Sequence, residues 1–415
     1  MDTIQFSDHV RRGDRVICGQ GAAEPITLLQ QLLEQRHAIG PFDLFIGMAL
    51  TDTVKPEHCD VISVSSFGGF GQNSRLGKEG ALNVLPIHLH DVPSLLESAV
   101  LRPDVVLVQV AGPDSDGNYS LGLVSDYLMQ AIEMARVVIA EVNPRAPMTY
   151  GETLVPQERF DVLTVSEAPP IYLPGATPTA EDDAIADHIA ERVQDGATIQ
   201  IGIGSAPNAI LSRLGSHKDI GFHSGTLTDA MADLMRSGVA TGARKPFDRG
   251  LAVTGTLLGT QELYDFADRN ESVSMRSVAY THNHVVLSQI DSLVSINSAV
   301  EVDLTGQVNA EVAGSRHVGA VGGQASFVRA GAEARNGFSV IALRSTARGG
   351  TVSRISTSLG AGVVTTSRSD VDLIATEYGV AELRGVGLAD RARRLIEIAH
   401  PEFRDELSRA AHDLV

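Results

Sequence analysis

The sequence predicts an α/β fold of two similar domains, each an open, mostly parallel sheet covered by helices. First, 415 residues are more than one ordinary domain uses. Second, the candidate strands Asp104–Val110, Val137–Val142 and Val371–Ala375 are short, largely apolar and not alternating, as strands covered on both faces are. Third, a strand, a G-x-G turn and a helix follow one another twice, at Gly13–Leu29 and at Gly196–Ser212.

In the two copies of this pattern, each pair of matching glycines is separated by the same number of residues. The glycines that match between them are Gly13 with Gly196, Gly19 with Gly202, and Gly21 with Gly204. Between the copies, the proline-rich segment Glu167–Ala184 has the composition of a linker. We therefore predict an N-terminal domain over residues 1–175 and a C-terminal domain over residues 176–415, the latter carrying most of the active site.

Helices are expected where apolar residues recur with helical spacing after a start signal. Within the linker, Thr179 followed by Glu181, Asp182 and Asp183 is such a signal, because these side chains cap and complement the start of a helix. The predicted helices are Glu24–Gln35, Asp182–Gln194, Pro207–Leu214, Leu227–Ser237 and Ala389–Ala399.

Composition excludes some classes of partner. The chain has 51 acidic and 33 basic residues, a net charge of −18, which repels nucleic-acid phosphates. Trp is absent and aromatic residues make up 5%, so stacked-base recognition is also disfavoured. We expect no nucleic-acid partner. The N-terminal residues show no targeting signal and no apolar run is long enough for a membrane helix, so we expect a cytoplasmic protein without a membrane partner.

Two features were considered as metal or disulfide sites. Cys18 and Cys59 are too few for a disulfide framework, and Cys18 lies in a strand-like run that favours a buried thiol. The histidines of His88-Leu89-His90 and His282-Asn283-His284 would share one face if both segments are strands. Because no carboxylate other than Asp91 follows at a ligand spacing, we expect no metal.

The segment Leu293–Phe327 combines a polar Asn, a strand-turn-strand and a glycine loop. Asn297 sits in an apolar run, where an unpaired amide would be costly. Gly319, Gly322 and Gly323 leave backbone N–H groups open to a ligand. This layout suits stabilisation of a carbonyl oxygen that becomes negative during reaction. The G-x-G turns at Gly19–Gly21 and Gly202–Gly204 could also hold an anion, or could be plain tight turns.

Motifs along nearly the whole chain resemble one family. SINSAVEVDLTGQVNAE, VGGQASF, ALRSTA, TTSRSDVDLIATEYGVAELRG and RARRLIEIAHPEFR occur in the order and spacing of the acetyl-CoA hydrolase/transferase family, whose members include 4-hydroxybutyrate CoA-transferase. QIGIGSAPNAIL, TGTLLGTQELYDF, GDRVICGQGAAEP and PDSDGNYSLG extend the resemblance towards the N-terminus. The resemblance implies two domains of the CoA-transferase type.

The family resemblance also implies an activity, which is the transfer of CoA between a small acyl-CoA and a carboxylic acid. The substrate is then a coenzyme A thioester with no permanently bound cofactor, and the protein is a homo-oligomer. In the family an Asn side chain and a glycine N–H polarise the thioester carbonyl, functions that fall on Asn297 and on Gly322 or Gly323. The expected CoA-binding residues are Gly202, Gly204, Gly319, Gln324, Arg329 and Arg344.

One position departs from the family pattern. The family carries a glutamate that attacks the acyl-CoA, and the matching segment here, Gly221–Ala230, has Gly225 at that place. Because covalent exchange requires a carboxylate at one defined point, the mechanism is expected to be atypical. Glu24, Glu311 or Glu377 could substitute for the missing carboxylate. Alternatively, water or a second substrate could enter at Gly225, with His223, Asp229 or Glu311 as general base.

Other interpretations of these residues remain open. His223 could be a hydrogen-bonded core residue, and Asp229 could simply cap a helix. At the level of function, the alternatives to transfer are an acyl-CoA hydrolase, a C–C hydrolase acting on a CoA-linked β-dicarbonyl with activated water, and a non-catalytic acyl-CoA-binding protein.

Overall fold

The computed structural model describes residues 4–166 and 168–412, which form two compact units. The first unit comprises the chain up to Pro174, Val253–Thr281 and Arg316–Gly322. The second comprises Gly175–Ala252, His282–Ser315 and the chain from Gly323 onward. The predicted linker therefore contains the first change of unit, and its first residue, Glu167, lies outside the described residues.

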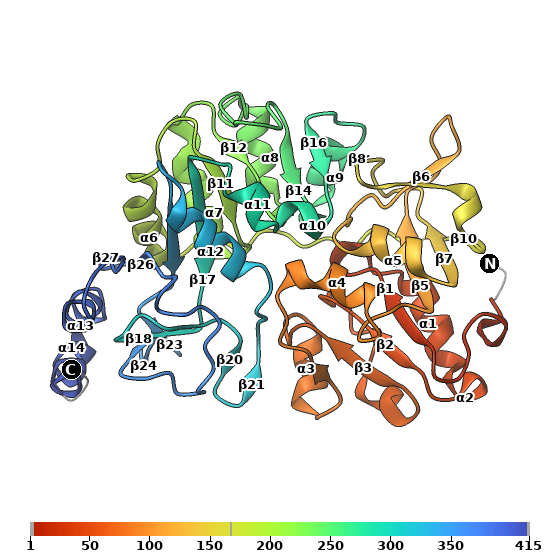
Figure 1. The fold of residues 1–415 in the computed structure, drawn as a ribbon, viewed down its shortest axis with the longest axis horizontal. Coiled ribbons are helices and arrows are strands. Elements are labelled where there is room, and N and C mark those ends of the chain that lie inside the picture. The colour runs from red at the N-terminus through yellow and green to blue at the C-terminus, as the bar shows by residue number, and fades with distance from the viewer. Residues whose placement is uncertain (1–3, 167, 413–415) are drawn as a thin grey trace. The chain divides into compact units, whose positions relative to one another are not determined.

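The first unit is built on a seven-stranded parallel sheet in the order β10-β7-β5-β1-β2-β3-β4 (Figure 1). The interior strand β5 (Val105–Val110) is buried at all six positions, which matches its largely apolar, non-alternating sequence. The other strands of the sheet are β1 (Arg15–Cys18), β2 (Asp43–Phe45), β3 (Ser63–Ser66), β4 (Asn83–Val84), β7 (Val137–Val142) and β10 (Val162–Val165).

Short helices and hairpin strands complete the first unit. The helices are α1 (Ile26–Glu34), α2 (Arg36–Ile39), α3 (Asn73–Lys78), α4 (Val92–Glu97), α5 (Leu128–Met134), α9 (Gln261–Ala267) and α10 (Val278–Thr281). The further strands are β6 (Asn118–Ser120), β8 (Tyr150–Gly151), β9 (Leu154–Pro156), β15 (Thr256–Leu257), β16 (Val273–Met275) and β21 (Arg316–His317), with β6 paired to β9 and β8 to β16. β14 (Ala252–Thr254) lies at a change of unit.

The second unit has a six-stranded sheet in the order β12-β11-β17-β22-β26-β27, of which only the edge strand β27 is antiparallel. Its strands are β11 (Thr198–Ile201), β12 (Gly221–Phe222), β17 (Leu293–Ser298), β22 (Phe338–Ala342), β26 (Leu373–Thr376) and β27 (Gly379–Glu382). Its helices are α6 (Ala180–Ala190), α7 (Ser205–Arg213), α8 (Asp229–Arg236), α11 (His284–Leu287), α12 (Gln324–Glu333), α13 (Leu388–Glu397) and α14 (Pro401–Ala411).

Smaller strands lie beside this sheet. They are β13 (Thr226–Leu227), β18 (Glu301–Asp303), β19 (Val308–Asn309), β20 (Val312–Ala313), β23 (Thr346–Ala347), β24 (Val352–Ser353) and β25 (Ile355–Ser356). The antiparallel pair β18–β19 turns at Gly306, whose positive φ of 92° suits glycine. This hairpin is the strand-turn-strand expected after Asn297.

The two sheets repeat one topology. In the first unit β1 lies between β5 and β2, and in the second β11 lies between β17 and β12. The order β7-β5-β1-β2 therefore corresponds to β22-β17-β11-β12, with the glycine turns following β1 and β11. This agreement confirms the predicted α/β fold of two similar, mostly parallel units.

Two histidine segments differ from the prediction. His88 forms only an isolated bridge and His90 lies in a 3₁₀ turn, while His282 follows α10 and His284 opens α11, so neither segment is a strand. Asn283 caps α11 by accepting a bond from the Val285 N–H, and a cap of this kind is a local interaction that the alternating pattern concealed. Within residues 4–166 and 168–412, no three His, Cys, Asp or Glu side chains are grouped to hold a metal ion.

Helix boundaries moved by a few residues. The helix predicted to begin at Leu227 begins at Asp229, because Leu227 belongs to β13. The helix predicted from Asp182 begins at Ala180, with Thr179 as its cap. None of the helices in the described part of the chain is both long and apolar enough to cross a membrane.

Candidate active site

The carboxyl ends of five parallel strands of the second unit, β12, β11, β17, β22 and β26, meet at one edge of the sheet. The chain leaves β11 towards β12 on one side and reaches β17 on the other. Parallel α/β sheets bind ligands at such a switch point, outside the carboxyl ends of the strands. The switch point here lies between Gly202, after β11, and Asn297, near the end of β17.

The Gly202–Gly204 turn is open on its ligand side. A Cβ added at Gly202 would meet no heavy atom within 4 Å. Gly204 has a φ of 133°, which only glycine adopts readily, and precedes α7 without a side-chain cap. The turn therefore leaves backbone close to the sheet edge uncovered, and CoA binding by Gly202 and Gly204 stays a prediction.

Asn297 belongs to a polar network on β11 and β17. Its Nδ2 donates to Gln200 Oε1 at 3.0 Å and to Ser295 Oγ at 2.9 Å, and Ser295 Oγ donates to Gln200 Oε1 at 2.8 Å. Gln200 and Ser295 are buried, whereas Asn297 is partly exposed at the strand end. The amide is thus oriented by its neighbours, and donation to a thioester oxygen would require it to exchange one of these bonds.

Gly225 lies at the same edge, beside the Gly202 turn. The His223 N–H donates to the Ile199 carbonyl, and Ser224 Oγ donates to the Ile201 carbonyl at 3.1 Å. Both His223 and Ser224 are fully buried. Gly202 directly follows β11 and Gly225 lies shortly after β12, so both glycines lie beyond the carboxyl ends of two adjacent strands.

An imidazole that was not among the predicted catalytic groups faces Gly225. A Cβ built on Gly225 would lie 3.1 Å from His282 Cε1 and 3.2 Å from Nε2. The same ring lies so close to Gly323 that a Cβ there would overlap it, and it meets the Phe327 ring edge-on at 4.8 Å. His282 is only 3% exposed. His282 therefore borders the place that a side chain at position 225 would occupy.

The other predicted acid and base groups have defined surroundings. Asp229 is the first residue of α8, in agreement with a role at the helix start. Glu311 is buried, and its Oε1 accepts a bond from Thr365 Oγ1 at 2.7 Å. Glu377 accepts bonds from the Ser345 N–H at 2.8 Å and from Ser345 Oγ. The carboxylates of Glu311 and Glu377 are therefore each held by a neighbouring loop.

The predicted glycine loop is divided between the units. Gly319 and Gly322 belong to the first unit, where their carbonyls accept bonds from the N–H groups of Gly69 and Leu89. Gly323 and Gln324 belong to the second unit, and Gln324 begins α12. In the described part of the chain, the buried Gln324 Nε2 has no hydrogen-bond acceptor. Of the four loop residues Gly319, Gly322, Gly323 and Gln324, the last two belong to the same unit as Asn297.

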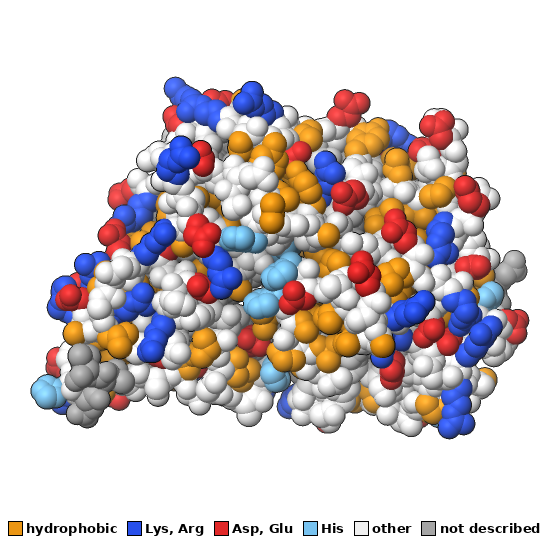
Figure 2. Space-filling view, viewed as in Figure 1, with side chains coloured by type: hydrophobic (Ala, Val, Ile, Leu, Met, Phe, Trp, Pro, Cys, Tyr) orange, Lys and Arg blue, Asp and Glu red, His pale blue; other side chains and the backbone are white. Residues whose placement is uncertain are grey.

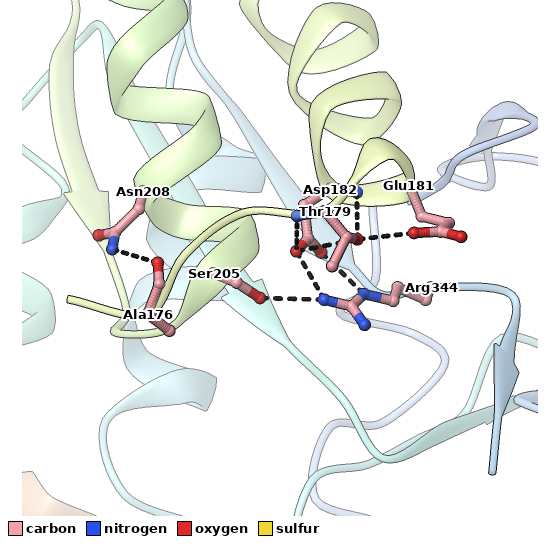
Figure 3. Close-up of polar contacts among 7 residues, drawn as sticks. All are labelled: Ala176, Thr179, Glu181, Asp182, Ser205, Asn208 and Arg344. Carbon is pink, nitrogen blue, oxygen red and sulfur yellow. Dashed lines mark hydrogen bonds and ion pairs between the residues drawn. The ribbon is translucent and has the colours of Figure 1, made fainter. Parts of the chain in front are cut away.

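Arg344 follows β22 and is fixed by the start of α6 (Figure 3). Its Nε and Nη2 donate to the two carboxylate oxygens of Asp182 at 2.9 and 2.6 Å, and Nη2 also reaches Ser205 Oγ at 3.2 Å. Burial opposes ionisation of Asp182, but the bonds from Arg344, the Thr179 N–H and Ser205 outweigh it and lower the Asp182 pKa. The pair is ionic and holds Arg344 in one orientation.

A pocket of about 430 Å³ opens beside this pair. Its lining includes Arg344, Arg348, Arg354, Glu377 and Tyr378. The pKa of Arg354 is lowered, first by burial and then by the positive charge of Arg344. An anionic ligand in the pocket would favour the charged form of Arg354 and so oppose both effects. The predicted CoA-binding residue Arg329 does not line the pocket and is paired with Asp370 at 2.9 Å.

In the first unit, the matching glycine turn holds two buried acids. Asp126 accepts bonds from Gln20 Nε2 at 2.5 Å and Thr256 Oγ1 at 3.0 Å, and Glu24 accepts bonds from the backbone N–H groups of Leu50 and Thr51. Burial raises the pKa of Asp126 to about 7 and that of Glu24 to about 7, although these bonds act in the opposite direction. Both acids therefore bind protons more tightly in the folded protein.

These raised pKa values predict a pH dependence of stability. The pKa of each acid is higher in the folded protein than its ordinary value. Each acid therefore contributes its full stabilisation of the folded state below about pH 4, and this stabilisation is lost as the pH rises to about 7. The slope is at most about 1.4 kcal/mol per pH unit for each acid. In the Asp126→Asn variant, the free energy of unfolding should decrease less steeply between pH 4.5 and 7.5 than in wild type, as measured by denaturant titration. The exposed Asp116→Asn should keep the wild-type slope, and an equal slope in Asp126→Asn would contradict the assignment.

Together, the repeated α/β units define a protein class, that of two-unit α/β proteins with a switch point at the carboxyl ends of the strands. Within that class the chain belongs to the acetyl-CoA hydrolase/transferase family. Residues 3–172 match the N-terminal domain model of the acetyl-CoA hydrolase/transferase family, and residues 259–411 match its C-terminal domain model. Gly225 lies between the two matched regions.

Curated relatives and a solved structure agree with this assignment. The chain is 36% identical to 4-hydroxybutyrate coenzyme A transferase of Clostridium kluyveri over 96% of this chain and 94% of the relative. It is 35% identical to succinyl-CoA:cyclohexane-1-carboxylate CoA transferase of Geobacter metallireducens over 98% and 94%. The crystal structure of RipA from Yersinia pestis superposes with a TM-score of 0.94 at 33% identity, covering 99% and 96%.

The family prediction and the prediction of an enzyme are therefore confirmed. CoA thioesters are the substrates on which this family acts.

Proposed function

We propose that this protein cleaves a small acyl-CoA with a nucleophile taken from solution, so that no enzyme carboxylate carries the acyl group or CoA. The observation that carries the proposal is Gly225 at the strand-end site, with the His282 imidazole beside it. A glycine cannot form the anhydride and the thioester that covalent exchange requires.

The glutamates considered as replacements support this proposal because each already has hydrogen-bonding partners. Glu311 is bound by Thr365, Glu377 by Ser345, and Glu24 by the Leu50–Thr51 backbone in the first unit. A carboxylate held by such bonds is a poorer nucleophile than a free one, since the bonds stabilise its charge. Water is then the simplest nucleophile, and the first product expected is free CoA together with the carboxylic acid.

Transfer of CoA is the second candidate, and the relatives favour it. Two relatives that match over nearly the full length are both named as CoA transferases. In this case the acceptor carboxylate would itself attack the thioester carbonyl. A C–C hydrolase acting on a CoA-linked β-dicarbonyl would use the same water at a different carbonyl, and its product would keep the thioester.

The test is a product analysis with a panel of short acyl-CoAs and β-dicarbonyl CoAs. Hydrolysis predicts free thiol from at least one acyl-CoA without any acceptor acid. Transfer predicts a new acyl-CoA only when an acceptor such as acetate is added. If the purified protein releases no thiol, forms no new acyl-CoA and cleaves no C–C bond, the proposed function is wrong.

We further propose that the arginine pocket receives the phosphates of CoA. A chain with a net charge of −18 must gather basic groups locally to bind a polyanion, and on the face visible in Figure 2 basic and acidic side chains are interspersed. The pocket offers Arg344, Arg348 and Arg354 together. Glu181 and Glu377 also line it, so the positive excess is small and binding would depend on the directed bonds of the guanidinium groups.

Substitution in the pocket should therefore weaken CoA binding without changing the chemical step. For Arg354→Gln we expect KM for the acyl-CoA to rise about tenfold while kcat stays within about twofold, since one charge-assisted contact is worth about 1.5–3 kcal/mol. Truncated acyl-pantetheine substrates, which lack the nucleotide, should show no such difference. Arg329→Gln, outside the pocket, is the matched control. Equal KM values for the two variants would contradict the role of the pocket.

A further inference from the structure

His282 occupies an unusual position at the strand-end site. Its Cε1 and Nε2 atoms lie 3.1 and 3.2 Å from the point where a side chain at position 225 would begin. The Nε2 and Cδ2 atoms also lie where a Cβ on Gly323 would stand, so Nε2 is bordered by both glycines, and the ring meets Phe327 edge-on. Glycine at 225 and at 323 is what makes room for the ring, because a Cβ at 323 would overlap it.

The chemistry of the ring fits the function proposed above. An imidazole nitrogen that carries no proton can accept one from water, which is what a general base does. At 3% exposure, His282 is shielded from bulk water, while Gly225 beside it is partly exposed. A water molecule beside Gly225 would thus lie within reach of Nε2 and next to the edge that carries Gly202 and Asn297. General-base catalysis requires a hydrogen bond between the base and the water that it deprotonates.

We infer that His282 is the general base that activates the attacking nucleophile, an inference that rests on the proposed function. In the hydrolytic reaction, the water oxygen forms a bond to the thioester carbonyl carbon as its proton passes to His282 Nε2. The carbonyl oxygen becomes an oxyanion held by N–H donors of the site. The intermediate then breaks its C–S bond, and the proton on His282 passes to the departing CoA thiolate. The products are CoA and the carboxylic acid.

This role belongs to none of the three bases that the sequence suggested, which were His223, Asp229 and Glu311. Glu311 accepts a bond from Thr365 Oγ1. His223 is buried within the strand end, and Asp229 begins α8. His284, two residues after His282, is exposed and lies 3.6 Å from Glu333. It therefore provides a control of the same residue type in the same segment.

The experiment compares thiol release by wild type, His282→Ala, His282→Gln and His284→Gln. Both substitutions of His282 should lower kcat by about 100-fold or more, which is the range of general-base catalysis. His284→Gln should remain within about twofold of wild type. Added imidazole should restore His282→Ala in a saturable manner, because the vacated space admits a free base, and it should not restore His282→Gln.

Rescue separates catalysis from structure, since a merely structural role would not respond to a dissolved base. The inference is overturned if His282→Ala is as active as His284→Gln, or if it is folded and inactive and imidazole restores nothing. It is also overturned if imidazole accelerates the wild type and His282→Ala by the same increment. If any of these three results is obtained while the wild type is active, the role of His282 is refuted and the proposed function still holds. A wild type that acts on no acyl-CoA refutes the proposed function itself.

Discussion

The double variant Gly225→Glu/His282→Ala is expected to acquire a covalent CoA adduct that wild type does not form. The new glutamate supplies the carboxylate that family exchange requires, and removal of the imidazole frees the space that its Cβ needs. The backbone at 225 has no positive φ, so an L side chain is tolerated there. Incubation with an acyl-CoA followed by intact-mass analysis should show a CoA-sized increment that hydroxylamine removes.

Two controls make this result specific. Gly225→Gln/His282→Ala has the same bulk but no nucleophile, and it should remain unmodified. Gly225→Glu alone should form less adduct than the double variant, because contacts of 3.1 and 3.2 Å force the side chain against the His282 ring. If the double variant is folded and binds acyl-CoA but gains no adduct, position 225 is not the place of the missing nucleophile.

Asp182→Asn should produce the largest loss of stability among single polar substitutions at the site. Asp182 is 1% exposed and holds both Arg344 and the N-terminus of α6, as Figure 3 shows. Removing its charge leaves the guanidinium without its ionic partner in a partly desolvated position, which costs about 3 kcal/mol. This expected cost lies at the low end of the range for a broken buried ion pair, because Arg344 is 36% exposed and its guanidinium can gain some hydration. Denaturant titration at pH 7 measures it.

The neighbouring Asp183 provides the comparison. It pairs with Arg213, and both side chains are more than a third exposed, so Asp183→Asn should cost less than about 1 kcal/mol. The difference between the variants should shrink at acid pH. Since the folded-state pKa of Asp182 is lowered, its contribution is present above the ordinary pKa near 4 and is lost as pH falls below it. Equal costs for the two variants would contradict a structural role of the Asp182–Arg344 pair.

The fold was predictable because it depends on local patterns. The predicted strands Asp104–Val110 and Val137–Val142 are largely apolar and not alternating, and the structure has strands at Val105–Val110 and Val137–Val142. The recurrence of the glycine turn predicted two units with one topology, and β1 and β11 hold the same place in their sheets. Alternation alone failed for the two histidine pairs, because a 3₁₀ turn, a helix end and the Asn283 cap determine those segments.

The site was only partly predictable because its contacts join distant parts of the chain. Gly225 and Asn297 were identifiable from motifs, and the strand order places both at one sheet edge. The contact between Gly225 and His282 joins residues 57 positions apart in the sequence, and the pattern that marked His282 pointed to a metal site and not to Gly225. The pairing of Asp182 with Arg344 spans 162 positions. Such contacts follow from the arrangement of strands and helices, which a local pattern does not contain.

The most direct test of the account is the mass of the wild-type protein while it turns over an acyl-CoA. Samples quenched from milliseconds to minutes are analysed by intact-mass spectrometry as free CoA accumulates. If the nucleophile comes from solution, the protein keeps its unmodified mass throughout turnover, with or without a borohydride or hydroxylamine trap. A CoA-sized or acyl-sized increment that forms and decays at the rate of turnover, located on a glutamate peptide, would contradict the account.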